Sequence, residues 1–338
     1  MVAVIIILCN DLEEDTVLKL QQHELQEINI MTTRVCVIGA GIAGLTSAYC
    51  IQNSIPNVKV TIVADKLSPN TTSDGSGGKW EPHLIHKSQE NLIRKWGQLT
   101  FDYLLKLFLS PDAKDAGVQL MSGFNFRLDT PETQNPFWKD TVIAYRTLTE
   151  QEIKTFKPSA KGGVFFTTLI LNSYKYLPWL MEKFQSKGGK IIKRKLNSIN
   201  EVYAPWLKHF YQDKDNKDLI LVLPGADGVV SVGGTNHVGN WDTSVHQEDK
   251  DRIWRGALNL VPSLKDARII DDWVGLRPSR KTIRLESEEL KSVSRPVMVI
   301  HNYGHSGSGI TLCWGCAQDV VELCKEAIHK LSERKSKL

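Results

Sequence analysis

The chain has no apolar run that approaches membrane-spanning length, and it carries little excess charge of either sign. Its 338 residues include 42 Lys and Arg against 38 Asp and Glu, a net charge of +4. The basic residues are not interleaved with aromatic residues in a stripe, so we expect neither a nucleic acid nor a membrane as a partner. A hydrophobic content of 41% is ordinary for a globular protein, and the length suggests about two domains.

Cysteine is sparse, with six residues in the whole chain. Most of them fall within apolar stretches, which indicates reduced, buried thiols in an intracellular protein. Cys313 and Cys316 have the spacing of a redox motif, but no second cysteine pair is present to complete a zinc site. We therefore interpret both as packing residues beside the last helix, and we predict no metal site.

The N-terminus lacks the basic segment of a secretory signal, and an acidic stretch follows its apolar residues. Residues 10–30 favour a modest polar helix. Met31 lies just before a strongly predicted strand, so we expect the working protein to start there. Residues 1–30 would then be an extension that plays no part in the fold.

A glycine-rich turn between a predicted strand and a predicted helix is the most informative feature. The apolar residues 35–38 lead into the pattern G-x-G-x-x-G at 39–44. The first glycine allows a sharp turn, the second lets a pyrophosphate approach the backbone, and the third lets the helix pack close to the strand. The free N–H groups of the helix start would bind the phosphates. The expected contacts with a nucleotide cofactor are Gly39, Ala40, Gly41, Ile42 and Gly44.

An acidic residue ends the next predicted strand, residues 58–64, at a spacing that suits hydrogen bonds to an adenosine ribose. Asp65 lies 21 residues beyond Gly44. The following stretch is rich in hydroxyl groups and glycine. This composition is typical of a flexible linker, but its place after a ribose-binding acid favours a cofactor-binding loop. The expected contacts are Asp65, Lys66, Thr71, Thr72, Ser73, Gly77, Gly78 and Lys79.

The pattern changes beyond an amphipathic helix predicted at 88–109. Short β-like runs predict an antiparallel sheet with two further helices. Arg277 stands between a strand-like run and a proline, where its planar guanidinium could bind a carboxylate or form a surface salt bridge. The runs are 141–148, 163–171, 218–223, 229–234 and 267–274, and the helices are 174–187 and 247–260.

The C-terminal region repeats the order of strand, glycine loop and helix. The strand is predicted at 297–300 and the helix from about Gly315 to Ser332. A second helix start would favour the negative charge of a reduced cofactor. No general base is obvious, because a histidine beside a glycine loop, such as His301 or His305, is more often structural. The expected cofactor contacts are Ser306, Gly307, Ser308, Gly309, Ile310 and Thr311.

In this order the segments resemble the family of FAD-dependent D-amino-acid oxidases and D-aspartate oxidases. The resemblance runs from Arg34 to the C-terminus. Its most specific parts, apart from the first glycine loop, are Ala64-Asp65-Lys66, Thr71-Thr72-Ser73-Asp74, Gly275-Leu276-Arg277-Pro278, His301-Asn302-Tyr303-Gly304-His305 and Trp314-Gly315-Cys316-Ala317.

The resemblance implies an α/β fold with a Rossmann-like FAD-binding domain interleaved with an antiparallel-sheet α+β substrate domain. The FAD-binding domain would comprise residues 31–86, 168–203 and 278–335, and the substrate domain residues 87–167 and 204–277.

The resemblance also implies the chemistry. Arg277 would bind the α-carboxylate of a D-amino acid, and the loop of Gly307 would receive its amine. The substrate Cα–H would leave as hydride to flavin N5, and dioxygen would reoxidise the flavin to give hydrogen peroxide. The products would be a 2-oxo acid and ammonia. The last residues, Ser336-Lys337-Leu338, would be a targeting signal that the peroxisomal import receptor reads, which predicts the peroxisomal matrix.

The chain departs from the family pattern at three places. Tyr203 runs directly into Ala204 where the family has a strand of the nucleotide-domain sheet and a loop near the flavin, so we expect a gap in the sheet and in the FAD site. Leu221 replaces a substrate-binding tyrosine. Asn236 replaces an arginine of the D-aspartate branch, although other features of this region slightly favour acidic substrates.

Two residues, Lys208 and His209, could supply the missing positive charge, and each is equally well explained as a surface residue. The sequence is also consistent with two other hypotheses about function. One is another flavin amine oxidase, such as a glycine or sarcosine oxidase. The other is a catalytically impaired, truncated isoform, to which the missing segment points.

Overall fold

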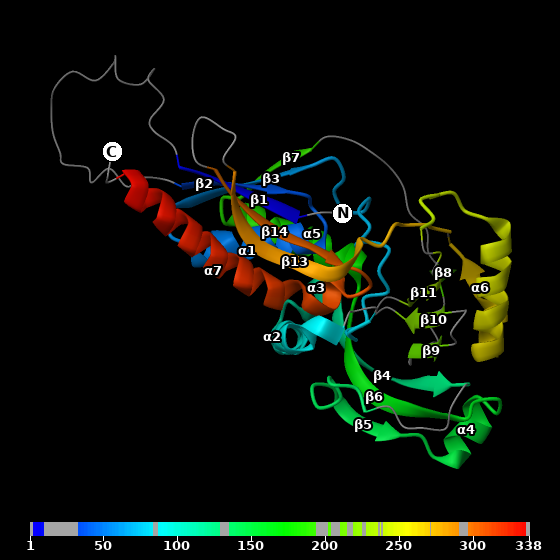
Figure 1. The fold of residues 1–338 in the computed structure, drawn as a ribbon. Helices are drawn as coiled ribbons and strands as arrows, with labels where there is room; N and C mark the ends of the chain where they lie inside the picture. Colours follow the sequence, from blue (N-terminus) through cyan, green and yellow to red (C-terminus); the bar gives the residue numbers. More distant parts are fainter. Residues whose placement is uncertain are drawn as a thin grey trace, which may run out of the picture.

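Two β-sheets organise the chain in a computed structural model (Figure 1). The structure describes residues 3–9, 33–83, 87–128, 135–193, 202–203, 210–214, 219–224, 228–235, 237, 239–270, 272–290 and 297–335. The expectations for residues 10–30, Met31, Ala204, Lys208, His209, Asn236 and the C-terminal tripeptide lie outside these residues. No helix within the described ranges is long and apolar enough to cross a membrane.

The first sheet has six strands and carries the first glycine motif. Its order is β13 (Ser279–Leu290), β14 (Val297–His305), β1 (Ala3–Cys9), β2 (Thr33–Ile38), β3 (Val58–Ala64) and β7 (Lys190–Lys193). Strands β2, β3 and β7 run parallel, whereas β1 is antiparallel to both β2 and β14. Alternate residues of β2, Val35 and Val37, are buried, as expected for a strand with one covered face.

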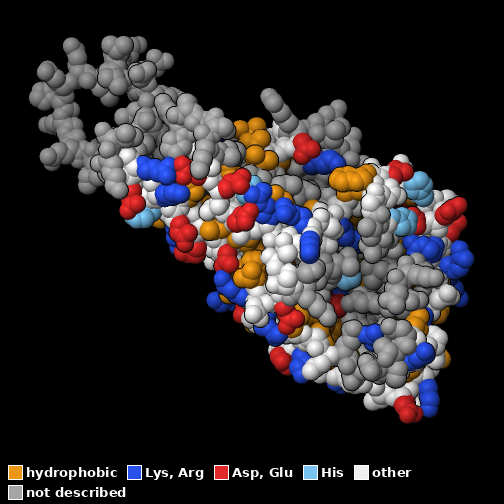
Figure 2. All heavy atoms as spheres, viewed as in Figure 1, with side chains coloured by type: hydrophobic (Ala, Val, Ile, Leu, Met, Phe, Trp, Pro, Cys, Tyr) orange, Lys and Arg blue, Asp and Glu red, His pale blue; other side chains and the backbone are white. Residues whose placement is uncertain are grey.

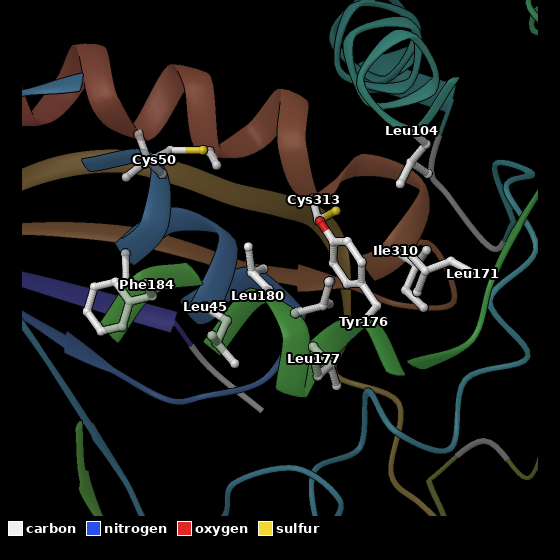
Figure 3. Packing of buried hydrophobic residues seen from close by; sticks show 14 of the residues in the cluster. Leu45, Cys50, Leu104, Leu171, Tyr176, Leu177, Leu180, Phe184, Ile310 and Cys313 are labelled. Carbon is white, nitrogen blue, oxygen red and sulfur yellow. The ribbon is translucent and has the colours of Figure 1, made fainter. Parts of the chain in front are cut away.

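Helices pack on this sheet and against one another. Helices α1 (Ile42–Ser54) and α7 (Gly309–Lys335) pack on the sheet, α5 (Ser173–Ser186) packs against α1, and α2 (Glu90–Phe108) packs against α7. Figure 3 shows their shared core, in which Leu45 and Cys50 of α1 lie near Tyr176 of α5 and Cys313 of α7. Figure 1 shows α7 running the length of the sheet.

The second sheet has eight strands, and all its neighbouring pairs except β4–β9 are antiparallel. The order is β12 (Arg268–Ile269), β8 (Val202–Tyr203), β11 (Val229–Gly233), β10 (Leu219–Pro224), β9 (Phe210–Lys214), β4 (Val118–Arg127), β6 (Gly162–Leu171) and β5 (Ile143–Thr147). Helix α6 (Gln247–Leu260) packs on its β9–β11 region. Two short helices, α3 (Ala113–Ala116) and α4 (Glu150–Phe156), and two 3-10 turns, Lys87–Gln89 and Pro262–Asp266, complete the described elements.

The expected α/β architecture with a second, antiparallel sheet is confirmed. The helices predicted at 88–109, 174–187 and 247–260 correspond to α2, α5 and α6. The last helix begins at Gly309 rather than near Gly315, because the second glycine loop is shorter than predicted. The expected domain boundaries at 168 and 203 fall within β6 and β8, and both strands belong to the eight-stranded sheet.

The expectation that the first 30 residues play no part in the fold is wrong for residues 3–9. Residues 3–9 form β1, which lies between β2 and β14 in the six-stranded sheet, and the side chain of Ile5 is completely buried. The position between these strands is therefore filled, so the gap in the sheet expected from the missing internal segment is not present there. The apolar run carried the strand signal, but nothing local indicated its partners.

The cysteines of the C-terminal helix are packing residues, as predicted. Cys313 and Cys316 are both buried and carry free thiols within α7. Burial raises the pKa of the Cys313 thiol to about 12, so it stays protonated and unreactive near neutral pH.

On the molecular face shown in Figure 2, basic and acidic side chains of the described residues are intermixed.

Candidate cofactor and substrate site

The first glycine loop joins β2 to α1 and depends on two glycines for steric reasons. Gly39 has a φ of 102°, a left-handed conformation that favours glycine, and its amide donates to the carbonyl of Val63 at 2.9 Å. A Cβ on Gly44 would lie 2.0 Å from the carbonyl oxygen of Gly39. Gly41 is the N-cap of α1 and has no side chain to cap the helix. Because the N-cap residue has no side chain, the backbone N–H groups at the start of α1 are suited to an anionic ligand.

A hydrogen-bonded turn lies beside this helix start. The buried carboxylate of Asp74 accepts hydrogen bonds from the amide of Thr71 at 2.8 Å, its hydroxyl at 2.6 Å and the Ser68 hydroxyl at 2.5 Å. Burial raises the pKa of Asp74, and these hydrogen bonds partly oppose that shift. The neighbouring hydroxyl of Ser73 accepts from the Ile42 amide at 2.9 Å. The loop is therefore fixed at the N-terminus of α1.

The acidic residue expected at the ribose position lies at the end of β3. Asp65 is exposed, and its carboxylate accepts a hydrogen bond from the Lys66 amide at 2.9 Å. Because β2 and β3 are parallel neighbours, Asp65 and Gly39 emerge at the same edge of the sheet. This is the arrangement that the spacing predicted for a dinucleotide cofactor.

The second glycine loop joins β14 to α7 and reaches the same edge. The Ser308 hydroxyl donates to the carbonyl of His83 and accepts from its amide, both at 2.7 Å. A Cβ on Gly309 would lie 3.4 Å from the Ile42 side chain, so the first turns of α7 and α1 adjoin. The two helix starts can therefore act on one elongated ligand.

Some of the predicted cofactor contacts already have protein partners. The Thr311 hydroxyl donates to the carbonyl of Glu81 at 3.1 Å. The Lys79 ammonium is buried, pairs with the Glu81 carboxylate at 2.6 Å and donates to the Gln212 side chain. These groups attach residues 79–83 to the start of α7 and to the eight-stranded sheet.

Arg277 lies beside the second glycine loop. The next residue, Pro278, accepts a hydrogen bond from the Ser306 amide at 3.3 Å, and the hydroxyls of Ser279 and Ser306 are 3.0 Å apart. The Arg277 guanidinium donates to the carbonyl of Thr235 at 2.8 Å. The residue is exposed, but surrounding protein atoms partly desolvate its charge and lower its pKa.

No carboxylate among the described residues pairs with Arg277, although ion pairs occupy many other arginines of the chain. This favours the carboxylate-binding interpretation over a surface salt bridge. Gly307 is exposed in the adjoining loop. The segment that follows Arg277 is hydrogen-bonded to Ser306, so it adjoins the loop that contains Gly307.

Three positioning residues were not among the predicted site residues. Asp74 fixes the loop after β3, and the hydroxyl residues around it were the available signal. Trp273 packs against two glycines: a Cβ on Gly75 or Gly275 would lie 2.3 or 2.2 Å from its indole ring. Glu81, two residues after Lys79, neutralises its ammonium. The alternation of side chains along an extended segment does not reveal such a buried ion pair.

A dinucleotide cofactor fits these residues. The first loop has a close-approach glycine and a helix start whose N-cap residue has no side chain, the acid follows β3, and a second helix start adjoins the first. Helix starts and backbone amides stabilise the negative charge of a pyrophosphate.

Comparisons with known proteins agree with this arrangement. The model of a family described as FAD dependent oxidoreductases matches residues 34–209 and 200–323. The D-aspartate oxidase of Homo sapiens is 34% identical over 334 residues, which cover 89% of this chain and 97% of the relative. A D-amino acid oxidase of Dugesia ryukyuensis is 33% identical and covers 88% and 98%.

Solved structures share the fold at low sequence identity. A glycine oxidase from Bacillus cereus superposes with a TM-score of 0.63 at 16% identity, covering 86% of this chain and 94% of that chain. An iminodiacetate oxidase from Chelativorans sp. BNC1 gives a TM-score of 0.64 at 14% identity, with the same coverage.

The matches also show an interruption. The two matched ranges of the family model meet at residues 200–209, which contain the junction of Tyr203 and Ala204. The 334-residue alignment with the human relative is longer than the 89% of this 338-residue chain that it covers, so the relative has residues without a counterpart here. With this interruption, the chain belongs to the family of FAD-dependent oxidoreductases that includes D-aspartate and D-amino acid oxidases, and its cofactor is FAD.

Proposed function

We propose that the protein oxidises D-amino acids with dioxygen and water to 2-oxo acids, ammonia and hydrogen peroxide. The observation that carries this proposal is the position of Arg277. The guanidinium of this exposed residue donates to Thr235 and has no carboxylate partner among the described residues, and the next residues, Pro278 and Ser279, contact Ser306 of the second glycine loop. A planar guanidinium suits the α-carboxylate of an amino acid. The names of the human and Dugesia relatives, a D-aspartate oxidase and a D-amino acid oxidase, support the same substrate class.

The residues of this chain would bind and orient the substrate. Arg277 already donates one N–H to Thr235 and has further N–H donors for the substrate carboxylate. The backbone carbonyl of the exposed Gly307 would accept a hydrogen bond from the substrate amine. Holding both groups fixes the direction of the Cα–H bond, so positioning rather than a side-chain base carries the rate. FAD supplies the hydride acceptor when it is bound.

The nearby histidine does not serve as a base in this proposal. His305 is buried directly before the loop, and burial lowers its pKa to about 4. It is therefore neutral near neutral pH and is shielded from substrate. This agrees with a reaction in which the substrate amine is neutral before the hydride leaves.

The preference between acidic and neutral side chains is a separate part of the proposal, with a slight preference for acidic substrates. Lys79 does not provide the charge for an acidic side chain, because its ammonium is paired with Glu81. Peroxide yields from D-aspartate and D-alanine, measured at equal concentration, distinguish the two. A higher kcat/KM for D-alanine would contradict the acidic preference without affecting the reaction class.

The decisive experiment purifies the protein with FAD and measures peroxide from D-aspartate and D-alanine, their L-enantiomers, glycine and sarcosine. We expect peroxide from a D-amino acid and none from its enantiomer. Peroxide from glycine or sarcosine alone would assign the protein to another group of flavin amine oxidases. A protein without bound flavin or activity would instead be the impaired isoform to which the missing segment points.

We further propose that the last three residues, Ser336-Lys337-Leu338, are read by the peroxisomal import receptor and direct the protein to the peroxisomal matrix. The tripeptide itself and the peroxide-forming reaction that we propose support this assignment. A fluorescent fusion should enter peroxisomes, and the same fusion lacking Leu338 should not. Peroxisomal import of the shortened fusion would contradict this proposal.

A further inference from the structure

The N-terminal strand lies between the two strands that lead into the glycine loops. β1 pairs with β2 on one side and with β14 on the other. Val4 is opposite Ile38, the last residue of β2, and Ala3 is opposite Asn302 near the end of β14. The first residues of β1 therefore lie at the sheet edge where both loops emerge.

This position of β1 sets the distance between the loops. Neighbouring strands are about 4.8 Å apart, so β2 and β14 are about 9.6 Å apart with one strand between them. Packed helices need about 8–10 Å between their axes. Helix α1 follows β2, α7 follows β14, and the two helices pack side by side. If β2 and β14 paired directly, the strand spacing would be about half of what these helices need.

The burial of β1 supports this role. Ile5 is completely buried and lies opposite Val37 on β2 and Ile300 on β14, which are also completely buried. Helix α7 packs across the same strand. Removal of β1 would expose these side chains and leave the backbone groups of two strands without partners.

We propose that residues 3–9 are a positioning strand that sets the separation of the two glycine loops, so that FAD binding depends on the N-terminal segment. This inference rests on the FAD cofactor and is independent of the substrate. It goes beyond the matched family region, which starts at residue 34.

A cross-link tests the register directly. Ile6 is paired with Cys36, which has a free thiol, and Ile7 is paired with Val35. The variant Ile6→Cys should form a disulfide with Cys36 under mild oxidation, because paired Cα atoms in an antiparallel ladder are close enough. The matched variant Ile7→Cys should not, because successive residues face opposite sides of a strand. Mass spectrometry of non-reduced peptides, with the unchanged protein as baseline, reads the result.

The same variant tests the effect on the cofactor. In the Ile6→Cys holoprotein, oxidation should slow the release of FAD several-fold, and reduction should restore the original rate, because the disulfide holds β1 in place. Equal release rates before and after a verified cross-link would overturn the positioning role. Failure of Ile6→Cys to cross-link, or an equal yield from Ile7→Cys, would overturn the placement of β1.

A second pair of variants is independent of thiol chemistry. Ile5→Lys should lose bound flavin during gel filtration because the charge cannot be buried there, whereas Ile5→Val should keep it. Retention of flavin by Ile5→Lys at the level of Ile5→Val would contradict the proposal. None of these three measurements uses a D-amino acid, so their outcome is separate from that of the proposed oxidase activity.

Discussion

The two glycine loops reach the same edge of the six-stranded sheet, but they are held there in different ways. Backbone sterics fix the first loop: the Cβ position of Gly44 lies 2.0 Å from the Gly39 carbonyl oxygen. Side-chain hydrogen bonds fix the second loop, through Ser306 to Ser279 and through Ser308 to His83. In our proposal the first loop binds the cofactor, whereas the second also adjoins the segment of Arg277.

This difference explains why only the first loop has a recognisable sequence motif. Steric requirements at the first loop restrict residues close together in sequence, so they produce a recognisable glycine spacing. The second loop depends on His83, 225 residues away from Ser308, and no local pattern encodes such a partner. Because the second loop contacts distant segments, it could link cofactor binding to the substrate binding that we propose for Arg277.

The largest expected effect comes from adding one methyl group to a glycine of each loop in turn. Gly44→Ala should lose bound FAD and about 3 kcal/mol of unfolding free energy, since the Gly39 carbonyl cannot move without opening the turn. Gly309→Ala is the matched control, because its Cβ would meet the flexible Ile42 side chain at 3.4 Å. It should change the unfolding free energy by about 1 kcal/mol or less. Equal flavin loss in the two variants, measured by absorbance after gel filtration, would remove the distinction.

The next prediction concerns the substrate side of the second loop. Arg277→Ala should retain FAD and lower kcat/KM for the best D-amino acid roughly a hundredfold, equivalent to about 3 kcal/mol. The loss reflects the missing charge-assisted hydrogen bonds to the α-carboxylate. Arg277→Lys should recover only part of the activity, because an ammonium lacks the planar pair of donors. Unchanged kcat/KM in Arg277→Ala would contradict the assigned role.

A pH effect should arise at the second loop. His305 has a pKa of about 4 when folded and about 6.5 when unfolded, so it is held neutral in the fold. Above pH 6.5 this histidine is neutral in both the folded and the unfolded chain, so it does not lower stability. As the pH falls toward 4, the unfolded chain gains a proton that the folded chain does not, and the free energy of unfolding decreases. At pH 5 the loss should be about 2 kcal/mol, measured by denaturant unfolding relative to pH 7. His305→Gln should show a smaller loss over this range, and an unchanged pH dependence would contradict the assignment.

The smallest expected effect comes from the hydroxyls of the second loop. Ser308→Ala removes both hydrogen bonds to His83 and should cost about 1 kcal/mol of unfolding free energy with flavin retained. Ser306→Ala is the control: its hydroxyl bond to Ser279 is exposed, so we expect about 0.3 kcal/mol. Equal thermal midpoints for the two variants would show that the buried attachment does not stabilise the loop.

The parts of the fold that could be predicted are those with local signals. The helices α2, α5 and α6 show apolar spacing or clear ends, and the first glycine loop has a steric code. Strand β13 was missed because its sequence, Ser279–Leu290, is largely charged, and its pairing with β14 is what makes it a strand. Strand β1 was misread because its partners lie elsewhere in the chain.

The site divides in the same way. The positions of Gly39, Gly41 and Asp65 at one edge of the sheet could be predicted from spacing alone, because each meets a local requirement of the turn pattern. The partners of Asp74, the ion pair of Lys79 and the contact of Trp273 with Gly75 depend on the folded chain. These interactions depend on burial and on contacts between distant segments of the chain. They cannot be inferred from the spacing of residues in the sequence.

The central claim is that both glycine loops hold one FAD molecule. Hydrogen–deuterium exchange of the protein with and without FAD tests it most directly, because peptides covering residues 39–44 and 306–311 report the two loops separately. We predict that FAD slows exchange in both segments. Protection of the first segment with unchanged exchange in the second would contradict the claim that the two helix starts act on the same ligand.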